Sequence, residues 1–456
     1  SAPSLRVNLI RKNYNIYRMI ISFHHILMDG WSFNIVLNEV LTFYESLVAQ
    51  KAVKLPEPRP FRDYIIWMQQ QGLSKAEAFW KNLLTPFAAP TDLRMSKPHN
   101  EVHGPDRYGE LKLELTESLS AALVGTAKRY HLTLNSIFQG CWALIVSRYS
   151  DEDIVVFGST SSGRQIPLQG VENMVGLFIN TLPVKVHAHQ DELLSEMLHK
   201  VQTQQAEARE YEYTPLQQIQ SWCGLSAGKS LFDSIVVFEN FPGRDGNEQR
   251  GKIKLSEPFV YDRNSFPLSI VIYPDRKITV YAKYDRKQIE EYAVKNALGH
   301  IENVLIQMAT GLDKKIDAIN ILPDWEVRQI LFGNNDTKRD YPTHMTLPAL
   351  FEKQVEKTPD AVAVVDGNRV LTYRQFNERA NQLGHYLRRL GVGPERLVGV
   401  FMERSMEMVL ALYGIHKAGG AYVPFDPEYP EERLAFMIED TNVQVMLTQK
   451  HLLDRM

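Results

Sequence analysis

The sequence FHHILMDGWS, residues 23–32, places two adjacent histidines, an Asp-Gly pair and a tryptophan inside an apolar part of the chain. The residues just before the histidines, 17–23 (YRMIISF), are mostly apolar and β-forming, which predicts a buried strand that the histidines end. The Met-Asp-Gly at 28–30 predicts a turn, and Ser32 is expected to cap the helix that follows. The stretch is therefore predicted to be a strand–loop–helix junction, where active-site residues of α/β proteins often lie.

The side chains in this stretch suggest proton transfer. Because neighbouring side chains of a strand point to opposite faces, His24 is expected to pack inward and His25 to face the loop, where it could move a proton. Asp29 could pair with an imidazole or an arginine, and Gly30 would allow a close backbone approach or a positive φ. Adjacent histidines diverge too far to share a zinc ion easily, so no metal is expected. Two purely structural histidines remain an alternative, and the residues alone indicate only an α/β enzyme candidate with a histidine base.

Composition limits the class of protein. The chain has 456 residues, enough for about two to four domains. Lys and Arg total 51 against 54 Asp and Glu, a balance that argues against a nucleic-acid or membrane partner. The two cysteines favour a reducing, cytoplasmic location. The first residues include neither an initiator methionine nor a signal peptide, which suggests that the chain begins inside a longer protein.

The order of predicted elements divides the chain at a linker. Residues 1–321 mix strands and helices and predict an α/β domain with a mixed sheet. Residues 322–346 combine Pro, Gly, Asn and scattered charges, as linkers do, and residues 347–456 show the βαβ alternation of a parallel sheet. Helices are expected at 61–71, 117–130, 133–148, 190–212, 286–310, 324–331, 347–357, 373–390 and 405–418. Extended segments are expected at 108–115, 153–164, 174–186, 233–239, 267–274, 277–284, 361–365, 396–402 and 421–423.

Several motifs together resemble the condensation domain of nonribosomal peptide synthetases. HHILMDGWS is similar to the HHxxxDG motif of that family, and four further motifs follow in the family's order. They are FRDYIIWMQQQ (61–71), GSTSSGR (158–164), VGLFINTLPVKV (175–186) and LFDSIVVFENFP (231–242). This resemblance implies the two-lobed fold of chloramphenicol acetyltransferase, with the N-terminal part of the first lobe lacking. The family's late Arg/Asn-rich motif keeps only its Pro-Leu in YDRNSFPLSI (261–270).

The second part of the chain resembles the start of an adenylation domain of the ANL type. LTYRQFNERANQLGHYLRRLGV (371–392) is similar to the first core motif of such domains, and HKAGGAYVPFDPEYPEERL (416–434) is similar to the second. The family's phosphate-binding loop, its ATP-binding aspartates and its catalytic lysine come later than residue 456. The resemblance therefore implies ATP and Mg²⁺ for an intact adenylation domain, at a site that this chain does not contain.

For the condensation domain, the resemblance implies amide bond formation between substrates held on phosphopantetheine arms. An upstream peptidyl carrier domain would present the thioester donor, and a downstream carrier domain would present the acceptor amine. His25 corresponds to the active-site histidine, as a base or as a positioning group. Asp29 would pair with an arginine to hold the loop, and the N–H of Gly30 is a candidate donor to the developing oxyanion. The residues expected to bind substrate or shape its site are His24, Trp31, Ser32, Ser161, Gly163, Arg164 and Asn180.

Expected roles within this set differ. His24 is expected to pack, and Trp31 and Ser32 to shape the loop. The Ser-Gly-Arg residues at 161–164 are expected near a pantetheine arm, and Asn180 is expected to fix the strand that crosses between the lobes. A structural role is an equal alternative for each member of this second group.

Other functions share part of the pattern. An epimerisation domain has the same HHxxxDG motif and fold, but its glutamate and Asn-Tyr motifs are not apparent, and an adenylation domain does not usually follow it directly. A heterocyclisation domain would carry DxxxxDxxS in place of the histidines. A non-catalytic platform that only binds carrier domains is the alternative of a different class. The histidine motif is also closer to domains that accept a donor of D configuration.

Overall fold

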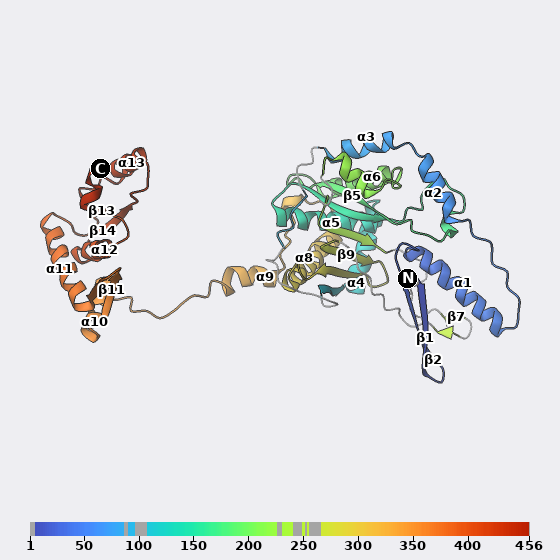
Figure 1. Ribbon diagram of the computed structural model, residues 1–456, viewed down its shortest axis with the longest axis horizontal. Coiled ribbons are helices and arrows are strands. Elements are labelled where there is room, and N and C mark those ends of the chain that lie inside the picture. Colours follow the sequence, from blue (N-terminus) through green and yellow to red (C-terminus); the bar gives the residue numbers. More distant parts are fainter. Residues whose placement is uncertain are drawn as a thin grey trace. The chain divides into compact units, whose positions relative to one another are not determined.

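The computed structural model describes residues 5–85, 90–95, 107–225, 230–239, 249–250, 253–254 and 266–455. The chain forms two compact units, Ser1–Asn335 and Asp336–Met456 (Figure 1). No helix in these described ranges is both long and apolar enough to cross a membrane.

A mixed sheet organises the first unit, as the sequence predicted, and it has six strands. Its strand order is β3-β10-β9-β6-β4-β5. Strand β6 pairs in parallel with β4 and β9, and the remaining pairs are antiparallel. The strands are β3 (Tyr108–Glu114), β4 (Ile154–Ser161), β5 (Asn180–His187), β6 (Ser234–Phe238), β9 (Leu268–Tyr273) and β10 (Thr279–Asp285).

Helices cover both faces of this sheet because its side chains alternate. Val155 and Phe157 of β4 point into the larger core with α4, α5, α6 and α8, whereas Val156 joins a second core with α3 and α7. The helix α5 is buried nearly all round, as expected for a helix at the centre of a core. The helices are α2 (Phe61–Gln70), α3 (Leu73–Leu84), α4 (Glu117–Arg129), α5 (Leu134–Ser150), α6 (Leu194–Arg209), α7 (Leu216–Trp222), α8 (Glu291–Thr310) and α9 (Asp324–Arg328).

The predicted strands and helices of this unit are present in the predicted order wherever they fall on described residues, but the strand β1 (Leu5–Asn13) and the helices α3 and α7 were not expected. The two short strands β7 (Gln249–Arg250) and β8 (Ile253–Lys254) were not expected either. Residues 261–265 of the expected late motif, and residues 240–242 of the motif at 231–242, lie outside the described residues.

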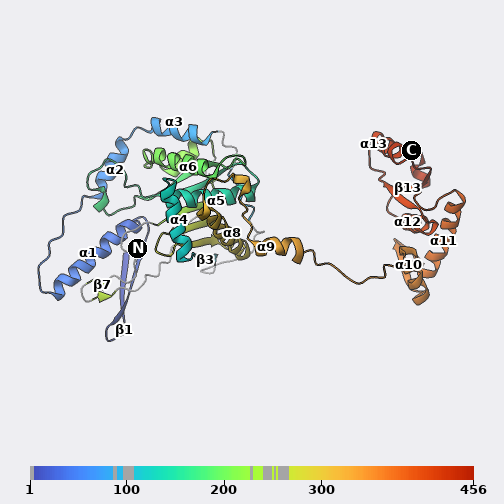
Figure 2. The same cartoon turned by 180° about the vertical axis from the view of Figure 1, so that it is seen from behind.

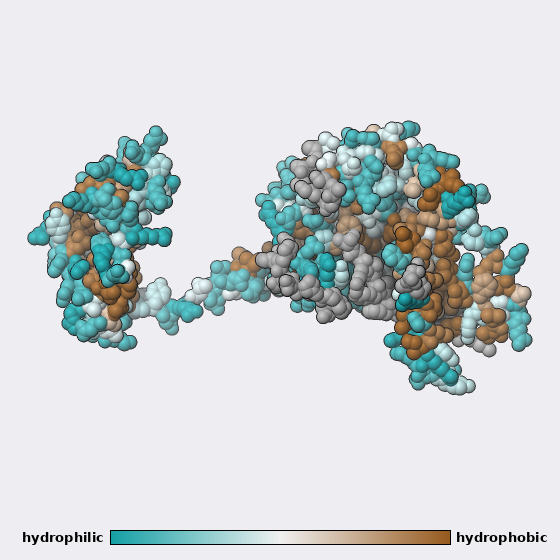
Figure 3. All heavy atoms as spheres, viewed as in Figure 1, coloured by the Kyte–Doolittle hydropathy of each residue, from teal (hydrophilic) through white to brown (hydrophobic). Residues whose placement is uncertain are grey.

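The predicted burial of the strand before the histidines is wrong. That strand is β2 (Ile16–Phe23), and it forms an antiparallel hairpin with β1 (Leu5–Asn13). Most residues of both strands are exposed, and within the described chain the hairpin pairs only with itself. Figures 1 and 2 show the hairpin at the same end of the unit as α1 (Gly30–Val48), and Figure 3 shows its apolar surface. An apolar strand pattern indicates a tendency to be buried but does not supply the layer that would cover it.

The second unit contains the expected parallel sheet. Its order is β14-β13-β15, with β13 at the centre. The helix predicted at 347–357 has those bounds, whereas β12, α13 and β15 were not expected. The elements are α10 (Leu347–Lys357), β11 (Val362–Asp366), β12 (Arg369–Thr372), α11 (Tyr373–Arg389), β13 (Leu397–Phe401), α12 (Met406–Ala418), β14 (Ala421–Phe425), α13 (Glu431–Thr441) and β15 (Val445–Thr448).

Candidate active site

The histidine pair lies in the loop between β2 and α1. Strand β2 ends at Phe23, and the side chains of His24 and His25 are both exposed. His24 Nδ1 accepts a hydrogen bond from the N–H of Ile26 at 3.2 Å. The prediction that His24 packs inward is wrong, because the strand has already ended and its alternation no longer applies. The His25 ring has no hydrogen-bond partner among the described residues, so its nitrogens are available to a substrate.

Asp29 caps the helix that follows. Its Oδ1 accepts the N–H of Ser32 at 2.8 Å, and its Oδ2 accepts the N–H of Phe178 at 3.0 Å. The expectation that Ser32 would be the cap is wrong, since Asp29 lies three residues earlier and its carboxylate satisfies two N–H groups at once. Gly30 is the first residue of α1 and does not adopt a positive φ. Its N–H belongs to a first turn whose N–H groups have no partner within the helix.

A buried arginine connects this loop to the sheet. Arg164 Nη2 lies 3.3 Å from Asp29 Oδ1 and 2.8 Å from Ser32 Oγ. Its Nη1 donates to the main-chain oxygens of Val171 at 2.6 Å and Met174 at 2.9 Å. Burial lowers the pKa of the Arg164 guanidinium, and the charge of Asp29 opposes that shift. The predicted pairing of Asp29 with an arginine is therefore present in the structure.

Trp31 and Ser32 attach the start of α1 to the segment before β5. Ser32 Oγ donates to the main-chain oxygen of Gly176 at 2.8 Å and accepts its N–H at 3.1 Å. Trp31 Nε1 donates to the main-chain oxygen of Glu172 at 3.0 Å. The Arg164 guanidinium also lies over the Phe178 ring, 4.0 Å from its centroid. Polar and aromatic contacts thus fix the loop from several sides.

The Ser-Gly-Arg turn is attached to a residue that the sequence did not single out. Ser161 and Asn180 are cross-strand partners at the ends of β4 and β5. The Ser161 hydroxyl donates to the carboxylate of Glu212, and Asn180 Nδ2 donates to the main-chain oxygen of Glu212 at 2.9 Å. Gly163 has a φ of +66°, and a Cβ there would lie 2.0 Å from the main-chain oxygen of Phe178. Only glycine fits that position.

The structure therefore collects the predicted residues into two connected groups. The first joins the loop to Arg164, and the second joins Ser161 and Asn180 through Glu212. The guanidinium of Arg164 is occupied by protein groups, so its expected role beside a pantetheine arm stays a prediction. Glu212 stands between two tyrosines in the sequence YEYTP. An acidic residue in an aromatic setting was the available signal for it.

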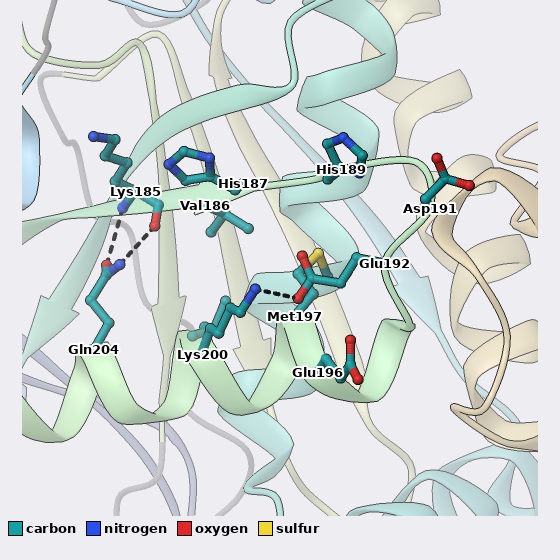
Figure 4. A pocket seen from close by; sticks show the side chains of 11 residues that line it. Lys185, Val186, His187, His189, Asp191, Glu192, Glu196, Met197, Lys200 and Gln204 are labelled. Atoms are coloured by element: carbon teal, nitrogen blue, oxygen red, sulfur yellow. Dashed lines mark hydrogen bonds and ion pairs between the residues drawn. The ribbon is translucent and has the colours of Figure 1, made fainter.

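A separate surface cavity lies at the edge strand β5. It has a volume of about 570 Å³ and lies between β5 and α6 (Figure 4). His187 and His189 line it together with charged groups, and the side chain of Gln204 hydrogen-bonds the main chain of Lys185. Burial and the nearby charges of Lys185 and Lys200 lower the pKa of His187. None of the predicted site residues lines this cavity.

Side chains outside the two groups of site residues add little to the chemistry of the site. Among the described residues there is no group of three or more His, Cys, Asp or Glu side chains suited to a metal ion. Burial raises the pKa of the Cys141 thiol, which makes it a poor nucleophile. In the second unit, the buried cation Lys417 is paired with Glu352.

The fold is that of the condensation domains of nonribosomal peptide synthetases. A solved four-domain nonribosomal peptide synthetase bound to AMP and glycine superposes with a TM-score of 0.78 at 24% identity, covering 99% of this chain and 35% of that chain. The first condensation domain of the CDA synthetase superposes with a TM-score of 0.58 at 14% identity, covering 70% of each chain. At these identities the likeness shows the fold.

Sequence comparison establishes the family. The condensation domain family matches residues 1–331, and the AMP-binding enzyme family matches residues 351–456. The chain therefore belongs to the condensation domain family and continues into the start of an adenylation domain.

Its relatives are antibiotic synthetases. One of the linear gramicidin synthase proteins of Brevibacillus parabrevis is 42% identical over 99% of this chain and 9% of its own length. Bacitracin synthase 3 of Bacillus licheniformis is 36% identical over 98% of this chain and 7% of its own length. This chain thus spans less than a tenth of either relative.

Proposed function

We propose that the first unit catalyses peptide bond formation between two substrates carried on phosphopantetheine arms. An upstream peptidyl carrier domain would bring an aminoacyl or peptidyl thioester, and a downstream carrier domain would bring an aminoacyl group with a free amine. The acceptor nitrogen attacks the thioester carbon, the C–N bond forms, and the C–S bond breaks to release the donor arm as a thiol. The product remains on the acceptor carrier.

The observation that supports this proposal most strongly is the exposed imidazole of His25 on a loop held by a buried Asp29–Arg164 contact. A fixed loop with a free imidazole suits a reaction in which an amine must be aligned and must lose a proton. His25 would take that proton or hold the amine by a hydrogen bond. The N–H of Gly30, in the first turn of α1, would donate to the developing oxyanion.

The proposal also includes the limits of the domains. Residues 1–321 form the condensation part, residues 322–346 form a linker, and residues 347–456 form the first part of the adenylation domain. In an intact parent protein, that domain would activate an amino acid with ATP and Mg²⁺.

The test uses a donor carrier and an acceptor carrier, each loaded with a different amino acid. They are mixed with this chain, and in parallel with a synthetase module that contains it, and the acceptor carrier is followed by intact mass. A dipeptide on the acceptor supports the proposal. Exchange of the donor α-hydrogen with solvent deuterium, without dipeptide, would instead identify an epimerase. Carrier binding with neither product would identify a binding platform.

A further inference from the structure

The connection between β4 and β5, residues 162–179, holds the histidine loop in place. It supplies Arg164 to Asp29 and Ser32, the main chain of Gly176 to Ser32, and the N–H of Phe178 to Asp29. The position of the loop therefore depends on where this connection begins and ends.

One residue on a different segment holds both ends of the connection. Glu212, which follows α6, accepts the Ser161 hydroxyl and the N–H of Gln165 at 2.9 Å with its two carboxylate oxygens. Its main-chain oxygen accepts Asn180 Nδ2 at 2.9 Å. Asn180 Nδ2 also reaches the main-chain oxygen of Thr214 at 2.6 Å. The entrance and the exit of the connection are thus tied to the same short segment.

The carboxylate of Glu212 is buried, where a charged group is energetically unfavourable. The residue is 1% exposed, and it forms no ion pair among the described residues. A buried carboxylate without a cation is unfavourable unless hydrogen bonds satisfy it. Its two oxygens receive a hydroxyl and a main-chain N–H on the two sides of the turn at 161–165. These two hydrogen bonds therefore fix the geometry of the turn.

This turn sets the direction of Arg164. Gly163 comes so close to the main-chain oxygen of Phe178 that a Cβ there would lie 2.0 Å from that oxygen, so the turn approaches the end of the connection on that side. Arg164 stands between Gly163 and Gln165 in the sequence. The carboxylate of Glu212 accepts a hydrogen bond from the N–H of Gln165. A displacement of Gln165 would therefore move the guanidinium away from Asp29 and Ser32.

We propose that Glu212 is a positioning residue for the condensation site, acting through the turn at 161–165 and Arg164 on the loop that carries His25. The proposal rests on the proposed condensation activity for its effect on rate. Its effect on the loop does not depend on that activity. Because Glu212 is 1% exposed and its carboxylate is held by Ser161 and Gln165, its loss should lower kcat and leave the KM for the loaded carriers nearly unchanged.

The variants separate the hydrogen bonds from the charge. Glu212→Ala removes both hydrogen bonds. Glu212→Gln keeps them, because its amide oxygen can accept the Gln165 N–H while its amide N–H₂ donates to the Ser161 hydroxyl, which can act as an acceptor. Ser161→Ala removes one of the two at a partly exposed position and serves if Glu212→Ala does not fold. Glu210→Ala, an exposed acid two residues away, is the matched control.

The first measurement is amide hydrogen exchange by mass spectrometry on the full chain. In Glu212→Ala and Ser161→Ala, exchange should rise in peptides that contain the N–H groups of Ser32, Gly176 and Phe178. It should stay unchanged in the core helix α5, which distinguishes a local effect from global unfolding. Unchanged exchange at the three N–H groups would overturn the proposal. So would an equal rise in α5, because Glu212 would then be only a stability residue.

The second measurement is the rate of dipeptide formation. Glu212→Ala should lower kcat by about tenfold to a hundredfold, the effect of a small displacement of an aligned group, and Glu212→Gln should restore most of it. Equal rates for Glu212→Ala and Glu210→Ala would overturn the catalytic part of the proposal. A wild-type protein that forms no dipeptide, combined with the predicted exchange pattern, would overturn the proposed function and still support the effect of Glu212 on the loop.

Discussion

Asp29 and Arg164 lie 135 residues apart in the sequence, and their side chains meet at 3.3 Å in a site where each is less than 5% exposed. Both carboxylate oxygens of Asp29 have hydrogen-bond partners. Oδ1 accepts hydrogen bonds from the N–H of Ser32 and from Arg164, and Oδ2 accepts one from the N–H of Phe178. This contact joins the start of α1, which follows the loop that carries His25, to the turn after β4.

Removal of the Asp29 carboxylate should destabilise the first unit strongly. Asp29→Ala leaves a buried guanidinium without its counter-charge and takes away the cap of α1, so we expect a loss of about 3–5 kcal/mol in the free energy of unfolding. All six tryptophans of the chain lie in the first unit. Urea unfolding followed by tryptophan fluorescence therefore reports this unit alone.

The control for that variant is another acidic residue paired with an arginine. Asp63, in the first turn of α2, pairs with Arg59 at 2.6 Å in a partly exposed contact. Asp63→Ala should cost only about 0–1 kcal/mol, because exposed pairs contribute little. Similar losses for Asp29→Ala and Asp63→Ala would show that the buried contact is not structurally important.

Two glycines with positive φ should respond differently to alanine. Gly163 and Gly170 have φ values of +66° and +82°, but only at Gly163 would a Cβ meet another atom, the main-chain oxygen of Phe178. Gly170→Ala should cost about 1–2 kcal/mol for its backbone conformation. Gly163→Ala should cost a further 1–3 kcal/mol or so for the steric conflict. Urea unfolding compares the two, and an equal cost would contradict the close approach of the turn to Phe178.

Acidification should lower the free energy of unfolding of the first unit, because it protonates Asp285. Burial would raise the pKa of this carboxyl, but hydrogen bonds from Arg107, from the N–H of Lys287 and from Gln288 outweigh it and lower the pKa. A carboxyl with a lowered pKa in the folded state stabilises the fold above its unfolded pKa of about 3.9. That stabilisation is lost as the pH falls through the folded value.

The corresponding measurement is urea unfolding at several pH values between 3 and 7 or so, the range around the carboxyl titration. Asp285→Asn should reduce the loss of stability on acidification. It should also lower the stability near neutral pH, where the wild-type carboxylate holds Arg107. A variant with an unchanged pH profile would show that other carboxyls control the acid sensitivity.

Local signals predicted much of the fold. The helix at 347–357 was predicted with the observed bounds, and in the structure Thr346 caps it and a proline stands in its first turn. The junction at the histidines was also predicted correctly. Its cap was not, since Asp29 and Ser32 are both cap-forming residues, and their arrangement involves distant partners such as the N–H of Phe178 and the main chain of Gly176. Sequence pattern identifies candidates, and long-range contacts select among them.

The candidate site was predictable in its residue types but not in its connections. The pairing of Asp29 with an arginine was expected, yet nothing local indicates which arginine is meant. Glu212 was missed because it follows the polar helix α6, where acidic residues are usually exposed. Its burial depends on β4, β5 and the turn between them, which come together only in the folded chain.

The most direct test of the central claim is the rate of dipeptide formation by His25→Ala, measured on loaded carriers by intact mass. His189→Ala, an exposed histidine away from the loop, is the control. The account predicts a rate lower by about a hundredfold or more for His25→Ala, the usual contribution of a general acid–base group, and a wild-type rate for the control. Dipeptide formed by His25→Ala at the wild-type rate would contradict the claim that His25 is the centre of the reaction.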